Sequence, residues 1–152
     1  MGKWFECKVK YSTAFGENED PKQAERKETY LIDALSFTEA EARVIKEVTP
    51  FVVGELEIQS VSKRNINEIV FNEDENADRW YKCKVLYITL EDDVEKETAT
   101  TWMVKAGDIE GALTHLNKVG MKGFQGDYWI SQIIETKIMD VLPYEAPEEE
   151  KK

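Results

Sequence analysis

The sequence predicts an α+β protein of two tandem ββαβ repeats, related by a pseudo-twofold axis, with an antiparallel sheet or sheets covered by two helices. The segment WFECKVKY begins at Trp4 and WYKCKVLY begins at Trp80, and five of their eight letters are identical. Each copy then alternates apolar and polar residues, which is typical of strands, and continues with helical spacing. One copy would leave apolar surface and sheet edges uncovered, so we expect two copies to close one core.

Each copy begins with a predicted β-hairpin. In the first copy, an irregular charged segment from Ser12 to Lys27 separates two alternating strands, and the second strand ends at Ala34. In the second copy, the polar segment EDDVEKETA leads to a strand that ends at Ala106. The opening strands match at an offset of 76 residues and the second strands at 72, so the first hairpin loop is four residues longer. A surface loop tolerates such an insertion.

A helix is predicted after each hairpin. Ser36 precedes FTEAEARVIKEV, and Glu39 stands three residues later, which is the pattern of a capping box. Asp108 precedes IEGALTHLNKV in the same way. Apolar residues recur at helical spacing, so one face of each helix is expected to pack. These residues are Phe37, Ala40, Val44 and Val48 in the first helix, and Ile109, Ala112, Leu113 and Leu116 in the second.

A long bent strand is predicted to end each copy. The apolar positions of the two copies match at an offset of 72, but their alternation breaks phase near 63–65 and 135–137, which predicts a bulge or a short turn. The resulting division is a first repeat at 1–71, an acidic linker at 72–78, a second repeat at 79–144 and a disordered acidic tail at 145–152. We favour one continuous sheet over two adjoining domains.

The charge of the chain restricts its partners. The 152 residues carry a net charge of −11, of which residues 1–71 contribute −3, residues 72–144 contribute −6 and the last eight residues contribute −2. A duplex DNA binder draws its affinity from Lys and Arg on phosphates, so we exclude that class and expect a basic or neutral partner. No apolar run approaches the ~20 residues of a membrane span, and no signal peptide pattern is present. We therefore expect a cytoplasmic protein with no membrane contact.

The titratable residues predict no catalytic or metal site. Cys7 and Cys83 match across the copies and alternate in phase with core residues, so buried thiols are expected, with a disulfide as the alternative. Together with the single histidine, His115, they cannot form a closed zinc site without carboxylates. His115 is expected to face solvent on its helix. The glycine-rich segment GMKGFQG follows a helix, whereas phosphate-binding loops open one, so no cofactor is predicted.

We therefore expect no enzyme. An enzymatic alternative would require isolated carboxylates to act alone, and the candidates are Asp33, Glu68 and Asp140.

The repeated opening strand supplies a candidate binding surface. Trp4 and Trp80 are out of phase with the inward residues, so they are expected on the opposite sheet face together with paired lysines. An aromatic residue beside lysines on an exposed sheet is typical of single-stranded nucleic-acid platforms. The preferred interpretation is that this face packs on the other repeat or on another protein. The surface comprises Trp4, Lys8, Lys10, Trp80, Lys82 and Lys84.

Four segments resemble a known family. WFECKVKY, YLIDALSFTEAEARV, FNEDENADRWYKCKV and ETKIMDVLPY are similar to a family of Bacteroidetes and their phages that is described as domain of unknown function 4494. The likeness runs from about Trp4 to Tyr144, and DALSFTEAEA is its most specific part. The resemblance implies a bacterial or phage setting inside the cell, and it implies no activity.

Two functions follow as hypotheses. The first is a non-enzymatic binding or assembly module of phage or mobile-element origin, which contacts a protein partner or itself through the repeated strand face or the sheet edges. The alternative is a single-stranded nucleic-acid-binding protein that uses Trp4, Trp80 and the paired lysines and carries an acidic C-terminal tail. A third possibility is an acidic decoy surface that occupies a nucleic-acid-binding protein.

Overall fold

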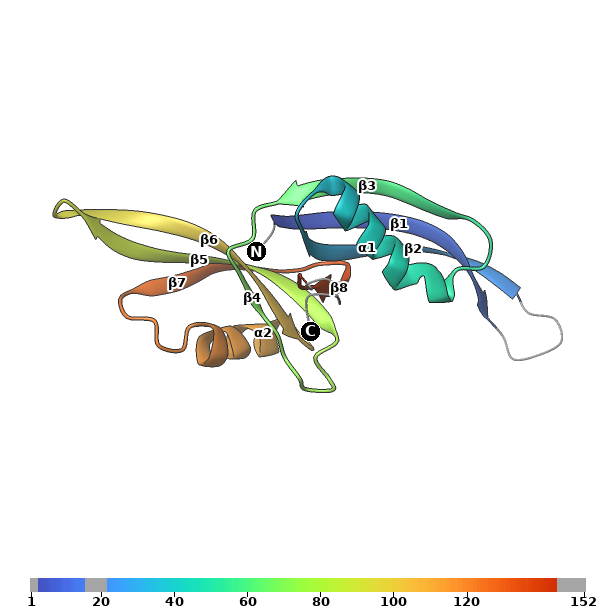
Figure 1. The fold of residues 1–152 in the computed structure, drawn as a ribbon. Helices are drawn as coiled ribbons and strands as arrows, with labels where there is room; N and C mark the ends of the chain where they lie inside the picture. The colour runs from blue at the N-terminus through green and yellow to red at the C-terminus, as the bar shows by residue number, and fades with distance from the viewer. Residues whose placement is uncertain (1–2, 16–21, 145–152) are drawn as a thin grey trace, which may run out of the picture. The chain divides into compact units, whose positions relative to one another are not determined.

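The computed structural model of the chain describes residues 3–15 and 22–144 (Figure 1). The predicted acidic tail at 145–152 and the tip of the first hairpin lie outside the described residues. The elements in chain order are β1 (Lys3–Phe15), β2 (Lys22–Ala34), α1 (Phe37–Val48), a 3-10 turn η1 (Thr49–Phe51), β3 (Leu56–Arg64), β4 (Glu68–Val70), β5 (Arg79–Glu91), β6 (Val94–Ala106), α2 (Ile109–His115), a π turn η2 (Leu116–Gly120), β7 (Tyr128–Glu135) and β8 (Ile138–Leu142). The predicted α+β class with two helices is confirmed.

The strands form two sheets. Sheet A has the order β3-β1-β2-β8, and sheet B has the order β4-β6-β5-β7. The pairs β1–β2, β1–β3, β5–β6 and β5–β7 are antiparallel. The pairs β2–β8 and β4–β6 are parallel. The favoured prediction of one continuous sheet is therefore wrong. Each repeat contributes its last strand to the sheet of the other repeat, so both sheets are complete with four strands.

The chain accordingly divides into two compact units that differ from the repeats read on the sequence. Unit 1 comprises Met1–Arg64 and Ile138–Lys152, and unit 2 comprises Asn65–Lys137. The predicted long bent strand of each copy is two strands in different sheets, separated by a short turn where the phase breaks. In unit 2 the backbone N–H of Asn67 donates to Thr101 O at 2.8 Å, which directs β4 toward sheet B. The predicted twofold relation concerns the placement of the units and stays a prediction.

The two hairpins have the same register. All four of their strands are 13 residues long, Phe15 pairs with Lys22, and Glu91 pairs with Val94. The loops therefore have six and two residues, and the predicted four-residue insertion lies entirely at the tip. The strands continue further into the polar segments than the sequence predicted. The reason is that ladder hydrogen bonds extend each ribbon beyond the part that a helix covers, so its polar side chains need no apolar alternation.

Bulges in the edge strands also match across the units. In sheet A the register with β1 shifts between Lys8 and Val9, where Gln59 is the extra residue of β3. In sheet B it shifts between Lys84 and Val85, where Ser131 is the extra residue of β7. A bulge bends its strand and strengthens the local twist. Both units therefore bend their edge strand at the same place.

One helix packs on one face of each sheet and forms its core. In unit 1, Ser36 Oγ accepts a hydrogen bond from Glu39 N at 3.1 Å, which confirms the predicted N-cap. The return bond differs from the predicted capping box, because Glu39 Oε1 accepts from Leu35 N at 3.4 Å and not from the N–H of Ser36. The core includes Phe5, Val9, Ile32, Ala40 and Val44 in unit 1, and Tyr81, Val85, Val104, Ala112 and Leu116 in unit 2.

Some predicted helix residues do not belong to these cores. Phe37 is exposed, although its ring meets Phe5 edge to face at 4.9 Å. Ile109 and Leu113 are exposed, and α2 ends at His115 and continues as a π turn, so its buried apolar face is smaller than the sequence predicted.

Candidate functional site

The two cysteines are buried structural thiols. Cys7 and Cys83 are free and 0% exposed, as the alternation predicted, and burial raises the pKa of each to about 11. For Cys7, the negative charges of Glu41 and Glu6 add to the effect of burial on the pKa. A thiol with a raised pKa forms little thiolate at neutral pH. Neither cysteine is therefore suited to nucleophilic chemistry.

The predicted tryptophan and lysine surface is not uniform. Trp80 is 1% exposed: the ring of Phe71 meets it edge to face at 5.6 Å, and Lys105 Nζ lies 5.9 Å from its ring centroid. Its counterpart Trp4 is half-buried. A ring that is covered in this way cannot stack on a base.

The lysines of the same surface are more accessible. Lys8, Lys82 and Lys84 are exposed, whereas Lys10 is half-buried and lies 3.4 Å from the carboxylate of Glu25. Of the six predicted residues, the structure therefore leaves Lys8, Lys82 and Lys84 exposed and buries the ring of Trp80.

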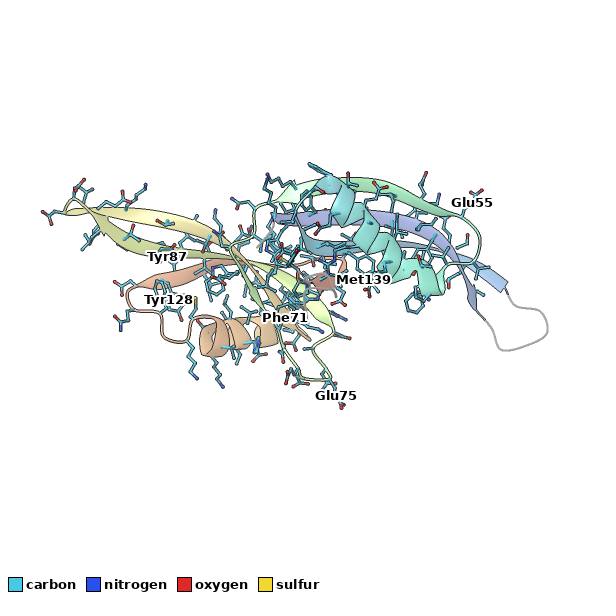
Figure 2. The ribbon with its side chains drawn as sticks, viewed as in Figure 1. Glu55, Phe71, Glu75, Tyr87, Tyr128 and Met139 are labelled. Carbon is cyan, nitrogen blue, oxygen red and sulfur yellow. The ribbon has the colours of Figure 1, made fainter. Side chains whose placement is uncertain are left out.

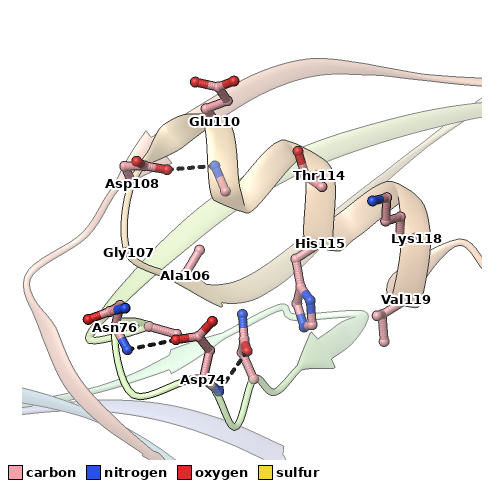
Figure 3. Close-up of a pocket in the computed structure, with 13 residues that line it drawn as sticks. Asp74, Asn76, Ala106, Gly107, Asp108, Glu110, Thr114, His115, Lys118 and Val119 are labelled. Carbon is pink, nitrogen blue, oxygen red and sulfur yellow. Dashed lines mark hydrogen bonds between the residues drawn. The ribbon is translucent and has the colours of Figure 1, made fainter.

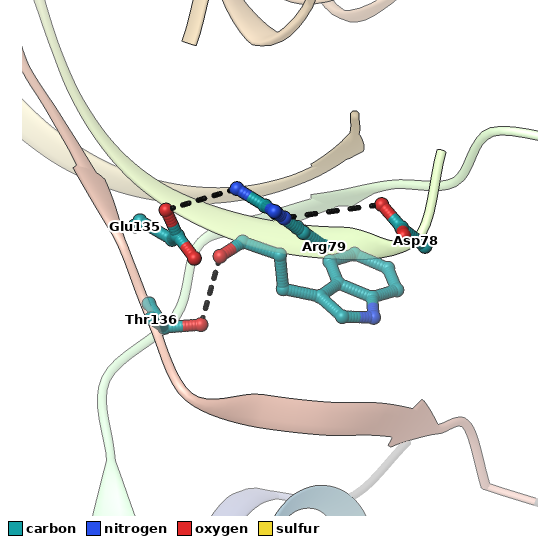
Figure 4. Close-up of polar contacts among 5 residues, drawn as sticks. Asp78, Arg79, Glu135 and Thr136 are labelled. Atoms are coloured by element: carbon teal, nitrogen blue, oxygen red, sulfur yellow. Dashed lines mark hydrogen bonds and ion pairs between the residues drawn. The ribbon is translucent and has the colours of Figure 1, made fainter. Parts of the chain in front are cut away.

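The beginning of β5 is fixed to the end of β7 by polar contacts (Figure 4). Arg79 lies 3.5 Å from Glu135 and 4.0 Å from Asp78, and Thr136 Oγ1 donates to Trp80 O at 2.8 Å. The backbone N–H of Thr136 donates to the same carbonyl at 3.0 Å. These bonds mark the end of β7, which is an edge strand of sheet B.

Strand β7 presents an apolar edge that the sequence analysis missed. Tyr128, Ile130 and Ile133 pack on the core of unit 2, while Trp129 and Ile134 alternate with them and are 41% and 44% exposed. The strand has no charged residue before Glu135. Native proteins usually protect an edge strand with charges, proline or a short length. Strand β7 lacks these protections apart from its bulge.

The matching edge of unit 1 is polar. Strand β3 carries Glu57 where β7 has Trp129, and Ser62 where β7 has Ile134, at the repeat offset of 72. Lys63 and Arg64 add charge at its end. The same position in the same fold is therefore apolar in one unit and polar in the other. A comparison of the two copies at this offset could have found the difference from the sequence.

An acidic ribbon projects from sheet B beside this edge. Tyr87 is the last residue of β5 that pairs with β7, opposite Tyr128 (Figure 2), and residues 88–97 continue as a two-stranded hairpin. Its two-residue turn has φ of 51° at Asp92 and 65° at Asp93, which is typical of a primed hairpin turn. The ribbon carries five acidic residues and one lysine, namely Glu91, Asp92, Asp93, Glu95, Glu97 and Lys96.

The net charge differs between the units. Unit 2 has fourteen acidic and eight basic residues, whereas the described part of unit 1 has ten of each. The negative charge of the described chain is therefore concentrated in unit 2, which also carries the apolar edge. This distribution favours a basic partner there.

A cavity of about 530 Å³ lies beside α2 in unit 2 (Figure 3). His115, which was expected to face solvent, is half-buried and lines this cavity, and its Nε2 lies 2.7 Å from Phe71 O. The reason is that the carbonyl of Phe71 offers the ring N–H a partner inside the fold. Asp74 Oδ1 accepts from Asn76 N, and Asp108 Oδ1 accepts from Gly111 N. The carboxylates of this cavity therefore shape the turn and cap the helix.

A second cavity, of about 510 Å³, lies in unit 1. Glu28 is only 8% exposed, and its Oε1 accepts hydrogen bonds from Tyr11 at 2.7 Å and Tyr30 at 3.0 Å. Burial, and then the bond to the Glu28 carboxylate, raise the pKa of Tyr11 to about 12 and raise the pKa of Tyr30 further. The predicted charged segment ends at Lys27, directly before Glu28, and the burial of Glu28 was not predicted.

The described residues offer neither a metal site nor a membrane helix. Among residues 3–15 and 22–144, no three His, Cys, Asp or Glu side chains lie close enough to hold a metal ion. None of the helices described is long and apolar enough to cross a membrane.

The chain belongs to the family described as Domain of unknown function (DUF4494), whose model matches residues 3–144. The match covers both units and therefore both copies of the repeat. No curated protein and no solved structure matches the chain.

Proposed function

We propose that this member of the DUF4494 family is a non-enzymatic binding module that holds an extended segment of a protein partner along strand β7. The observation that carries the proposal is the pair of exposed apolar residues Trp129 and Ile134 on an edge strand whose counterpart β3 has Glu57 and Ser62. Since both units fold on the same plan, the fold does not require an apolar edge. Binding explains why one edge has it.

The backbone of β7 supplies the affinity in this proposal. An edge strand presents unpaired N–H and C=O groups, and an extended peptide can add to the sheet by bonding to them. Side chains that alternate along the added strand then contact Trp129 and Ile134 on one face. A partly exposed tryptophan is a frequent anchor of protein interfaces. The partner segment is therefore extended, with an apolar residue at every second position.

The charge of unit 2 indicates what else the partner carries. The acidic ribbon at 88–97 begins where β7 begins, at the pair Tyr87 and Tyr128. Complementary charge speeds association and fixes the direction of a bound segment. We therefore infer a partner strand with lysine or arginine at the end that lies beside the ribbon. An origin in a phage or mobile element, acting in the cytoplasm of a bacterial host, is part of the proposal and is supported by the sequence motifs.

Selection from a library of short random peptides tests the proposal directly. The immobilised chain is expected to enrich peptides that alternate apolar residues and carry basic residues at one end. Trp129→Lys and Ile134→Lys should weaken the selected peptides by about tenfold or more, because each removes an anchor. The matched variants Glu57→Lys and Ser62→Lys on β3 should bind as the wild type does. Failure to enrich any peptide, or equal loss in both sets of variants, contradicts the proposal.

A second copy of the chain could supply the strand. In that case sedimentation should show a dimer whose dissociation constant rises with Ile134→Lys and stays constant with Ser62→Lys. A monomer at all concentrations assigns the edge to a different protein.

Binding of single-stranded nucleic acid is the second candidate, and the exposed ammonium groups of Lys8, Lys82 and Lys84 favour it. The cover over Trp80 and the net charge oppose it. Titration of tryptophan fluorescence with oligonucleotides at low salt decides between the candidates. Quenching that disappears with Lys84→Glu would support nucleic acid, and unchanged fluorescence would rule it out.

A further inference from the structure

The cavity of unit 1 contains a buried carboxylate with one free oxygen. Glu28 lines the cavity and is 8% exposed, and both tyrosine hydroxyls donate to its Oε1. No described residue donates a hydrogen bond to Oε2, and none forms an ion pair with Glu28. The two tyrosine hydroxyls compensate the burial of Oε1, whereas Oε2 is not an enclosed atom and is open to the cavity. This open, charged oxygen therefore provides a place for a cationic ligand.

Two further carboxylates line the same cavity. They belong to Glu47 on α1 and Asp140 on β8, and they face a single basic lining residue, Arg26. Asp140 uses one oxygen, Oδ1, to accept from Val141 N at 2.9 Å, which leaves its second oxygen available. The three acids and one base give the cavity a net negative charge. A cation entering it is therefore attracted from outside as well as bound inside.

The walls of the cavity fit an organic cation better than a metal ion. Tyr11 and Tyr30 line its inner part, and Phe51 and Met139 are exposed lining residues. Aromatic rings bind ammonium groups by cation–π attraction, and an apolar rim accommodates an aliphatic stem. A hard metal ion needs six or more close oxygens, and the described carboxylates do not converge into such a group. The cavity volume of about 510 Å³ is within the usual range for small ligands.

Unit 2 shows that the fold does not need this cavity. At the repeat offset of 72, Thr100 stands in place of Glu28 and Trp102 in place of Tyr30. Thr100 Oγ1 donates to Val85 O at 2.8 Å and accepts from Trp102 Nε1 at 2.9 Å, so the matching polar groups are neutral and satisfied. Val119 likewise stands in place of Glu47.

The matching cavity of unit 2 is correspondingly smaller. It measures about 300 Å³ and is lined by Glu68, Trp102 and Val119. The unit 2 cavity keeps one carboxylate, the exposed Glu68, so a buried carboxylate flanked by two further acids is found in unit 1 alone of these two cavities.

We propose that the cavity of unit 1 binds a primary ammonium group on an aliphatic stem. The ammonium donates to Glu28 Oε2 and is neutralised by Glu47 and Asp140, while the stem lies against Phe51 and Met139. This binding is independent of the β7 edge. The ligand is either a free aliphatic amine or the lysine side chain of another protein, since both present the same chemistry.

Calorimetry with the full chain at constant ionic strength tests the proposal with four probes. Cadaverine represents a free amine, capped lysine represents a protein side chain, 1,5-pentanediol is the neutral match, and calcium chloride tests a metal ion. Binding of cadaverine and capped lysine is expected, whereas pentanediol and calcium should not bind. Binding of capped lysine alone identifies a protein as the source. The proposal is overturned if neither amine binds, or if pentanediol or calcium binds as tightly as the amines do.

Variants then locate the binding in unit 1. Glu28→Gln should weaken the amine by about tenfold or more, because the lost bond is charge-assisted. Glu47→Gln should weaken it by about threefold, and since Glu47 is exposed on α1 this variant folds even if Glu28→Gln does not. Asp140→Asn should weaken binding, while the matched change Glu68→Gln in unit 2 should leave it constant. Binding that is insensitive to both Glu47→Gln and Asp140→Asn would contradict the site.

Discussion

Units 1 and 2 share one backbone plan and differ in the chemistry placed on it. The hairpin registers, the edge-strand bulges, the buried cysteines and the helix caps are the same in both units. The edge strand is polar in β3 and apolar in β7, and the cavity contains a buried carboxylate only in unit 1. Features present in both units are those that the fold requires. Features present in one unit are free to serve binding.

The exchange of last strands explains why both repeats are needed. Each sheet takes its fourth strand from the other repeat, β8 in sheet A and β4 in sheet B. A repeat on its own would lack that strand and leave β2 or β6 as an open edge. The exchange therefore links the two repeats while their edges and cavities diverge.

The largest expected effect is at Gly107, where the units differ in local packing. A Cβ atom on Gly107 would lie 2.5 Å from Asn76 O, a backbone atom, whereas the matching Leu35 of unit 1 is exposed. Gly107→Ala should lower the free energy of unfolding by about 1–3 kcal/mol because the turn at Asn76 must move. Leu35→Ala should change it by less than about 0.5 kcal/mol. Urea denaturation followed by tryptophan fluorescence measures both, and equal effects would contradict the assigned packing.

The next effect concerns the buried tyrosines of unit 1. Burial and the Glu28 carboxylate raise the pKa of Tyr11 from 10.0 to about 12 in the folded chain. Its neutral form therefore stabilises the fold fully below pH 10, and this stability is lost as pH rises through 12. Melting temperatures from pH 9 to 12 should fall less steeply in Tyr11→Phe than in the wild type. Identical slopes in Tyr11→Phe and the wild type would refute the assignment.

A smaller effect is expected at the tip of the second hairpin. Asp92 and Asp93 both have positive φ, which glycine adopts without the steric cost that other residues incur. Asp93→Gly should stabilise unit 2 by about 1 kcal/mol, and Asp93→Val should destabilise it. Thermal unfolding checks the opposite signs. A rise in melting temperature with valine would show that the turn is not of the primed type.

The smallest expected effect concerns the charged residues at the start of the two opening strands. Unit 2 has an ion pair between Arg79 and Glu135, whereas unit 1 has Lys3 and Lys63 at the matching positions. The neighbouring Lys3 side chain lowers the pKa of Lys63. Lys63→Glu should raise the melting temperature by at most about 2 °C, because exposed pairs contribute little. The rise should vanish at high salt, and a rise that persists there would have another cause.

The sequence was sufficient for features that depend on local pattern. The capping of α1 by Ser36 and the burial of Cys7 and Cys83 follow from the spacing within each copy. The four-residue insertion follows from the change of offset between the two copies. The candidate surface was predicted from the same alternation. The residues that cover Trp80 were not, because Phe71 and Lys105 come from segments distant from it in the sequence.

The strand exchange and the cavity depend on contacts between residues that are far apart in the sequence. Strands β4 and β8 come from equivalent positions of the repeat, so the alternation of Ile69 or Val141 fits either sheet equally well. Glu28 directly follows the predicted charged segment that ends at Lys27, and only the pairing of β1 with β2 brings Tyr11 and Tyr30 together on its carboxylate. The apolar edge was visible in the sequence as Trp129 against Glu57. This difference points to a binding surface only once β3 and β7 are known to be edge strands.

Nuclear Overhauser contacts across the parallel strand pairs test the exchange of strands most directly. The account predicts backbone contacts between Leu31 and Val141 in sheet A and between Met103 and Ile69 in sheet B. If each repeat kept its own last strand, the contacts would instead join Leu31 to Ile69 and Met103 to Val141. Observation of this second pattern would contradict the account.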